Sequence, residues 1–338
     1  MGYILEKESF NEVLKKLGEK YRLYAPVRKI GEGRFTDVDV VRYDFVNCLE
    51  DMELEAKSDY SFKELLTPLS QTLFFFTEGE TKEADMDTSD VIIFLRACDL
   101  HSVKRLDDIY LNNKFADPFY EKIRAHVQFA LIGCSHSFEN CFCVDMESNI
   151  APEQYLFSLD VSGDLVKSAV RSEEIEKLFQ SVSAKQEEVI PAHVTENPVR
   201  VEIPDEIPNT VYQSKLWEEY SARCIDCGRC NMVCPTCTCF TMQDTFYTEN
   251  GKVGERRRVA ASCMINGYTR VAGGGEYRRT NGERMRFKVL HKISDHRKRF
   301  GYNMCVGCGR CDDVCPEYIK FSNIINKVNR AVKEEGVR

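Results

Sequence analysis

Two cysteine runs with the same spacing constrain this chain more than any other feature. Each run has the form C-x-x-C-x-x-C-x-x-x-C-P, at residues 224–235 and 305–316 of the 338-residue sequence. Bacterial ferredoxins hold [4Fe-4S] clusters with this spacing, in which three thiolates bind one cluster and the fourth binds the other. The rule assigns the first cluster to Cys224, Cys227, Cys230 and Cys315. It assigns the second cluster to Cys305, Cys308, Cys311 and Cys234.

Zinc is the alternative metal, because it also binds Cys-x-x-Cys pairs. It would make the chain a zinc-dependent nucleic-acid-binding module, a different class of protein. Zinc sites usually use two separated pairs, whereas a third cysteine three residues on and a proline after the fourth favour iron and sulfur. The net charge of -8 and the lack of a helix-turn-helix pattern also disfavour nucleic acid. The sequence therefore predicts an electron-transfer protein with no nucleic-acid partner.

The 70 residues between the two runs, 235–304, are more than a minimal ferredoxin needs and predict an inserted subdomain. This segment contains Cys237, Cys239 and Cys263. Either of the first two could replace Cys234 as the crossing ligand, although structural packing is the default for all three. Residues 252–300 carry fourteen Lys and Arg against four Asp and Glu. Since a thiolate-ligated cluster is an anion, we interpret this excess as charge that stabilises the reduced clusters.

The first part of the chain has the pattern of an α/β domain. Residues 10–17 have helical periodicity, and residues 34–45 alternate as a strand does. Short apolar runs at 91–95 and 127–132 predict buried strands, with a helix at 102–110 between them. These three elements form a strand-helix-strand unit.

Four prolines among polar residues mark a linker at 184–210. The fold predicted from this division is α+β or α/β. An N-terminal α/β domain, 1–183, precedes the linker. A mainly helical dicluster ferredoxin-like domain, 211–338, follows it and ends in a charged helix at 322–335.

A third [4Fe-4S] cluster is predicted in the N-terminal domain. Cys98 and Cys134 each follow one of the two apolar strands, so both are expected at the carboxyl edge, where open α/β sheets build their sites. The loop after Cys134 adds Cys141 and Cys143, giving four soft ligands. The alternative is that these cysteines are small buried hydrophobes, which is how we interpret Cys48.

Other cofactors and compartments are not supported by the sequence. No G-x-G-x-x-G opens a helix after a strand, so we expect no flavin or NAD on this chain. The N-terminus lacks the pattern of a signal peptide, and no apolar run is long enough to cross a bilayer. We therefore expect a cytoplasmic protein without a membrane partner. In that reducing compartment, sixteen cysteines favour metal binding over disulfides.

Several longer stretches resemble the iron-sulfur subunit of anaerobic sulfite reductase. They are RACDL at 96–100, FENCFCVDM at 138–146, SARCIDCGRCNMVCPTCTCF at 221–240, GERRRVAASCM at 254–264 and MCVGCGRCDDVCPEYIKFSNIINK at 304–327, with GRFTD at 33–37. One departure is AGGGEYR at 272–278, where the family tends to have histidine after two glycines.

The resemblance implies an oxidoreductase complex in the cytoplasm that reduces sulfite to sulfide with NADH. This chain would relay electrons from a flavin and nicotinamide subunit to a siroheme subunit, and would carry no siroheme and no catalytic residue itself. The family's ligands map onto the twelve cysteines named above. The main alternative is the β subunit of a cytoplasmic sulfhydrogenase, which has a similar two-domain plan.

Overall fold

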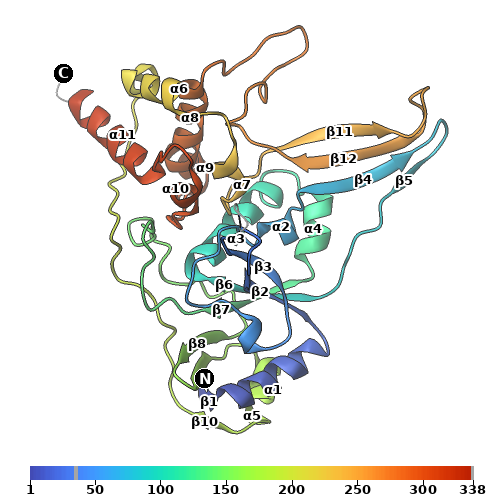
Figure 1. The fold of residues 1–338 in the computed structure, drawn as a ribbon, viewed down its shortest axis with the longest axis vertical. Helices are drawn as coiled ribbons and strands as arrows, with labels where there is room; N and C mark the ends of the chain where they lie inside the picture. Colours follow the sequence, from blue (N-terminus) through green and yellow to red (C-terminus); the bar gives the residue numbers. More distant parts are fainter. Residues whose placement is uncertain (34–36, 336–338) are drawn as a thin grey trace.

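The structure is a computed structural model that describes residues 1–33 and 37–335. An eight-stranded mixed sheet forms the N-terminal part (Figure 1). Four central strands run parallel, and antiparallel strands extend the sheet on both sides. In sheet order the strands are β10 (Ala184–Gln186), β1 (Gly2–Glu6), β9 (Leu165–Ala169), β8 (Ser158–Ser162), β7 (Val127–Ile132), β6 (Val91–Arg96), β2 (Arg22–Lys29) and β3 (Val40–Val46).

The two apolar runs are confirmed as the neighbouring parallel strands β6 and β7. All six residues of β6 are buried, because helices cover both faces of the sheet at this point. Ile92 and Phe94 face a core shared with α1 (Lys7–Gly18) and α5 (Glu173–Gln180). The alternate residues of β6 face a second core. That core is shared with α2 (Lys63–Leu66), α3 (Ala97–Tyr110) and α4 (Pro118–Arg124).

The helix expected at 102–110 is confirmed, but it begins earlier, at Ala97, so Cys98 lies in its first turn. The helix predicted at 10–17 is confirmed as α1. The strand predicted at 34–45 corresponds to β3, which begins only at Val40. Residues 34–36 of that prediction, which also belong to GRFTD, lie outside the described residues.

The C-terminal part is mainly helical, and its apolar core includes Trp217, Val289 and Ile325 together with Phe142 and Met146 from the N-terminal part. The terminal helix predicted at 322–335 is confirmed as α11. The helices are α6 (Glu218–Arg223), α7 (Arg229–Met232), α8 (Asn281–Leu290), α9 (His296–Phe300), α10 (Arg310–Val314) and α11 (Phe321–Glu335), with a π-helical turn at His291–Asp295 between α8 and α9.

A second, four-stranded sheet joins the two parts of the chain and projects to one side (Figure 1). Its strands are β11 (Phe240–Phe246), β12 (Gly254–Ala260), β4 (Ser70–Phe76) and β5 (Thr81–Glu83), all antiparallel. The first two belong to the segment between the cysteine runs, and the other two belong to the N-terminal part. The mixed α and β fold predicted from the sequence is confirmed.

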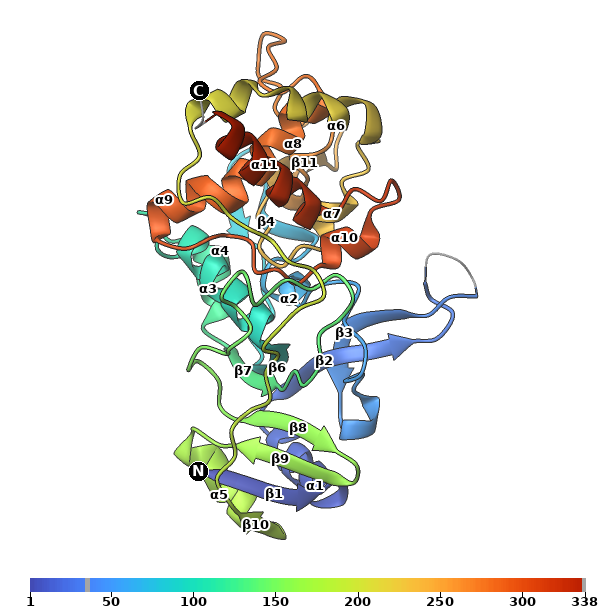
Figure 2. The same ribbon diagram turned by 90° about the vertical axis from the view of Figure 1, so that its left-hand side faces the viewer.

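The segment 184–210, predicted to be a linker, begins with the short strand β10 and then follows an extended path to the C-terminal part (Figure 2). Its last two residues belong to the short 3-10 helix Asn209–Gln213. The division into two domains at this segment stays a prediction.

Candidate metal centres

The two ferredoxin runs fold into the same local structure. Gly228 precedes α7 with a φ of 69°, and Gly309 precedes α10 with a φ of 74°. Glycine reaches this left-handed region without steric cost, so the chain can turn sharply from the second cysteine of each run into the helix that carries the third. The helices α7 and α10 contact each other, and the two runs therefore lie together.

The cysteines assigned to the first cluster come together. Cys224, Cys227, Cys230 and Cys315 line a single cavity, which is closed on its inner side by Met264, Met285 and Phe321. Cys315 belongs to the second run and reaches the cysteines of the first, as the ferredoxin rule expects. Cys311 lines the same cavity, so the first and second groups are neighbours.

The cysteines assigned to the second cluster also come together. Burial raises the pKa of Cys305 to about 12 and that of Cys308 to about 11. Cys234, from the first run, lies close enough for its charge to raise both pKa values further, and it acts in the same way on the buried Cys311. The structure thus places the fourth thiol of each run beside the first three of the other. Their role as ligands stays a prediction.

The four cysteines of the predicted third site also lie near one another. Burial raises the pKa of Cys143 to about 12, and the charges of Cys141 and Cys134 contribute to the rise. Burial also raises the pKa of Cys98, with contributions from the charges of Cys143 and Cys308. Since Cys308 belongs to the second group, the third group adjoins it.

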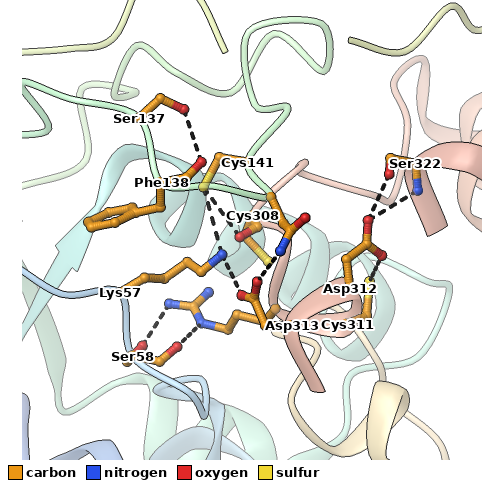
Figure 3. A network of polar contacts seen from close by, with 12 residues as sticks. Lys57, Ser58, Ser137, Phe138, Cys141, Cys308, Cys311, Asp312, Asp313 and Ser322 are labelled. Carbon is orange, nitrogen blue, oxygen red and sulfur yellow. Dashed lines mark hydrogen bonds and ion pairs between the residues drawn. The ribbon is translucent and has the colours of Figure 1, made fainter. Parts of the chain in front are cut away.

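Direct backbone contact joins the third group to the second. The amide of Phe142 donates to the carbonyl of Gly307 at 2.8 Å. The thiol of Cys141 donates to the carbonyl of Cys308 at 3.5 Å (Figure 3). A Cβ on Gly307 would lie 2.5 Å from the Phe142 carbonyl, and one on Gly309 would lie 2.2 Å from the Asn140 carbonyl oxygen. The two loops can approach this closely only because both positions are glycine.

Buried charged groups hold this contact in place. Arg310 and Asp99 form a bidentate ion pair at 2.7 and 2.8 Å, and both side chains are almost completely buried. Arg310 also donates to the carbonyl and hydroxyl of Ser58 (Figure 3). Beside it, Asp313 accepts from Lys57 at 2.5 Å and from Asn140 at 2.7 Å. Arg310 lies between two cysteines of the second group and Asp99 follows Cys98, so the pair joins the two sites.

Three buried lysines show that the surroundings of these cysteines suit a negatively charged metal cluster. Lys63, Lys288 and Lys292 are at most 6% exposed, and within the described ranges none has a carboxylate partner. Burying an unpaired ammonium is costly, so each needs a negative group nearby. Lys292 donates to the sulfur of Cys234 at 3.3 Å, and thiolate charge raises its pKa against the opposing effect of burial. Lys288 faces Cys230 and Cys311.

These lysines suit thiolate-held clusters, which are anions. Lys63 donates to the carbonyls of Asn231 and Cys237, and burial lowers its pKa. Lys288 and Lys292 belong to the basic stretch at 252–300. Lys63 and the Asp99–Arg310 pair were not found from the sequence, because nothing in the local pattern shows that residues so far apart meet.

The four remaining cysteines lie in three different places. Cys237 hydrogen-bonds Cys234, so it stays a possible replacement for it as a ligand. Cys239 instead hydrogen-bonds Cys263, which also accepts from the side chain of Asn231 at 3.1 Å. Cys48 lies apart from these groups, at the start of a short 3-10 helix.

No three His, Cys, Asp or Glu side chains among the described residues are placed to hold a single metal ion. A cubane does not need such a site, because each of its four thiolates binds a different iron. In residues 1–33 and 37–335, none of the helices has the length and apolar character required to cross a membrane.

One protein family matches the region of the two cysteine runs. Residues 223–319 match the 4Fe-4S dicluster domain, a range that contains both cysteine runs and the segment between them. The chain therefore contains an iron-sulfur domain with [4Fe-4S] clusters.

A relative matches over almost the whole length. Sulfhydrogenase 2 subunit beta of Pyrococcus furiosus is 29% identical over 347 aligned residues, which cover 98% of this chain and 100% of the relative. The chain is thus a homologue of a subunit of an oxidoreductase, and an electron-transfer role agrees with this. The relative is a sulfhydrogenase subunit, so the assignment to anaerobic sulfite reductase is not confirmed.

Proposed function

We propose that this chain is the electron-relay subunit of a multi-subunit oxidoreductase and carries three [4Fe-4S] clusters. The observation that carries the proposal is the unbroken contact between its three groups of cysteines. The first two groups share the α7 and α10 contact, and the second and third share the hydrogen bond between Phe142 and Gly307. Each bound cluster supplies a centre that takes up and releases one electron.

The protein's own residues would hold and tune these centres. The first would be held by Cys224, Cys227, Cys230 and Cys315, the second by Cys234, Cys305, Cys308 and Cys311, and the third by Cys98, Cys134, Cys141 and Cys143. Lys288 and Lys292 provide positive charge at the first two groups, which favours the reduced state. Lys57 does so at the third, where its ammonium lies 4.0 Å from the sulfur of Cys141.

We infer that the complex is of the sulfhydrogenase type, which the full-length relative supports. A cytoplasmic anaerobic sulfite reductase is the second candidate, supported by the similarity of the stretches at 221–240 and 304–327. In both, a flavin and nicotinamide subunit would exchange electrons with this chain. The two proposals differ in what lies at the other end of the relay, a nickel-iron subunit or a siroheme subunit.

Purification of the complex distinguishes these candidates. The tagged chain is isolated without oxygen from its native host together with its bound subunits, and metals and absorbance are measured. Nickel in stoichiometric amount supports the sulfhydrogenase type, whereas siroheme absorbance without nickel supports sulfite reductase. A colourless preparation that contains zinc would contradict the relay itself.

Iron content tests the third site. Three cubanes require about twelve irons per chain, and Cys98→Ser should reduce this to about eight. Cys48→Ser is the matched control, because Cys48 lies outside all three groups. If the wild type binds about eight irons and Cys98→Ser does not change that number, there is no third cluster.

A further inference from the structure

The first cysteine group lies at the surface, and this exposure sets it apart from the rest. Cys227 is exposed, whereas the other eleven predicted ligands are half-buried or buried. Ile225 and Cys227 both line the cavity of the first cysteine group, and the side chain of Ile225 is 55% exposed to solvent. The side chain of Ile265, 44% exposed, lies 3.0 Å from the position that a Cβ on Gly228 would occupy. The rim around the exposed thiol therefore contains two apolar side chains, together with the exposed carboxylate of Glu317.

Tyr318 extends this rim on the side of the second run. It follows Cys315 by three residues and is 82% exposed. Its φ of 51° is unusual for a residue with a large side chain. The turn serves the chain itself, because the amide of Ile319 donates to the sulfur of Cys315 at 3.3 Å. The ring extends into solvent and offers an apolar surface next to the first cysteine group.

A basic groove continues from Tyr318 along α11. Tyr318 and Ile319 line it, and Ile319 also lines the cavity of the first cysteine group, so groove and cavity adjoin. The cations that line the groove are Arg200, Arg223, Lys320, Lys327, Arg330 and Lys333. Among the described residues, only three carboxylates, those of Asp145, Glu202 and Glu219, form ion pairs with them. The groove therefore carries an excess of positive charge.

Two arginines around this surface are free to pair with another molecule. Arg330 in the groove and Arg229 beside Cys230 are exposed, and within the described ranges neither forms an ion pair. The chain as a whole has a net charge of -8. A positive region on an acidic protein orients a partner of the opposite charge during approach.

We propose that this region, the Cys227 face, is the docking surface for an acidic redox protein. The face consists of Ile225, Cys227, Ile265 and Tyr318, with Arg229 and Arg330 as its free cations and Glu317 as a free carboxylate. An apolar centre with a charged rim is the form of surface through which proteins associate briefly and with correct orientation. This inference rests on the proposed relay, because it assigns the point at which electrons enter or leave the chain.

The experiment measures binding of an acidic bacterial ferredoxin to the purified full-length chain, with the clusters of both proteins oxidised. Arg229→Glu combined with Arg330→Glu should weaken binding about tenfold at low salt, and the difference should shrink as salt is raised. Tyr318→Asn should also weaken binding, and asparagine tolerates the left-handed backbone, so folding is preserved. Lys177→Glu is the matched control, since Lys177 is exposed on α5 at the opposite end of the molecule.

With a basic partner in place of the acidic ferredoxin, the double variant should have the opposite effect. Cytochrome c is a basic protein that accepts one electron, so the dithionite-reduced double variant should reduce it faster than the wild type does. Ferredoxin binding that is equal in wild type and double variant, or weakened equally by Lys177→Glu, would overturn the docking surface. Failure of dithionite to reduce the chain would contradict the relay instead, and the binding result would stand by itself.

Discussion

The ion pair between Arg310 and Asp99 gives the sharpest test of how the second and third sites are held together. Asp99 is 0% exposed and Arg310 is 2% exposed, so Arg310→Met leaves a buried carboxylate without its partner. Removal of one member of such a pair costs about 3–5 kcal/mol. With a denaturant slope of about 2–3 kcal/mol/M, the urea midpoint should fall by about 1–2.5 M.

Fluorescence of Trp217 reports this transition, because it is the only tryptophan and is buried in the C-terminal core. Unfolding is followed without oxygen, together with cluster absorbance. Arg310→Met combined with Asp99→Leu should recover most of the loss, since no charge then stays buried. A single-variant shift no larger than that of the exposed control Arg229→Met, or a double variant less stable than the single one, would refute the reasoning.

Three further results are expected. Lys292→Met should lower the reduction potential of a cluster by on the order of 100 mV, since a charge about 6 Å away contributes roughly 3 kcal/mol at an effective dielectric of 20. Equal potentials in this variant and in the exposed control Lys298→Met would contradict this expectation. Burial lowers the pKa of His291 to about 4. As the pH is lowered, the imidazole of His291 takes up a proton in the unfolded chain before it does so in the folded chain. The free energy of unfolding should therefore fall by up to about 3 kcal/mol between pH 6.5 and 4, and His291→Gln should not show this part of the decrease. Gly309→Ala should destabilise more than Gly301→Ala, because both have positive φ but only the first new Cβ meets backbone; equal melting temperatures would disprove this.

Much of the site was predictable because its signals are local. The spacing of each cysteine run fixes a tight loop and a short helix, and both runs adopt it with glycine at the turn. The apolar runs at β6 and β7 predicted parallel neighbours, which places Cys98 and Cys134 at one edge of the sheet. Physical rules that act over a few residues were sufficient for these features.

The rest depends on contacts between distant parts of the chain. Lys63 meets Cys237 from 174 positions away, and Arg310 meets Ser58 from 252 positions away. Neither of these contacts between distant residues is marked by a periodicity or a motif in the sequence. The pairing of β4 with β12 is equally remote, and the short apolar run of β4 does not specify its partner.

That pairing has a consequence for biosynthesis. The ribosome releases β4 long before β12, so a nascent chain presents one edge of the β4–β5 hairpin, including Phe74 and Phe75, until about residue 260 has emerged. An N-terminal fragment that ends in the linker would keep this edge open permanently, and such edges promote aggregation. We therefore expect an isolated N-terminal part to aggregate more readily than the full chain.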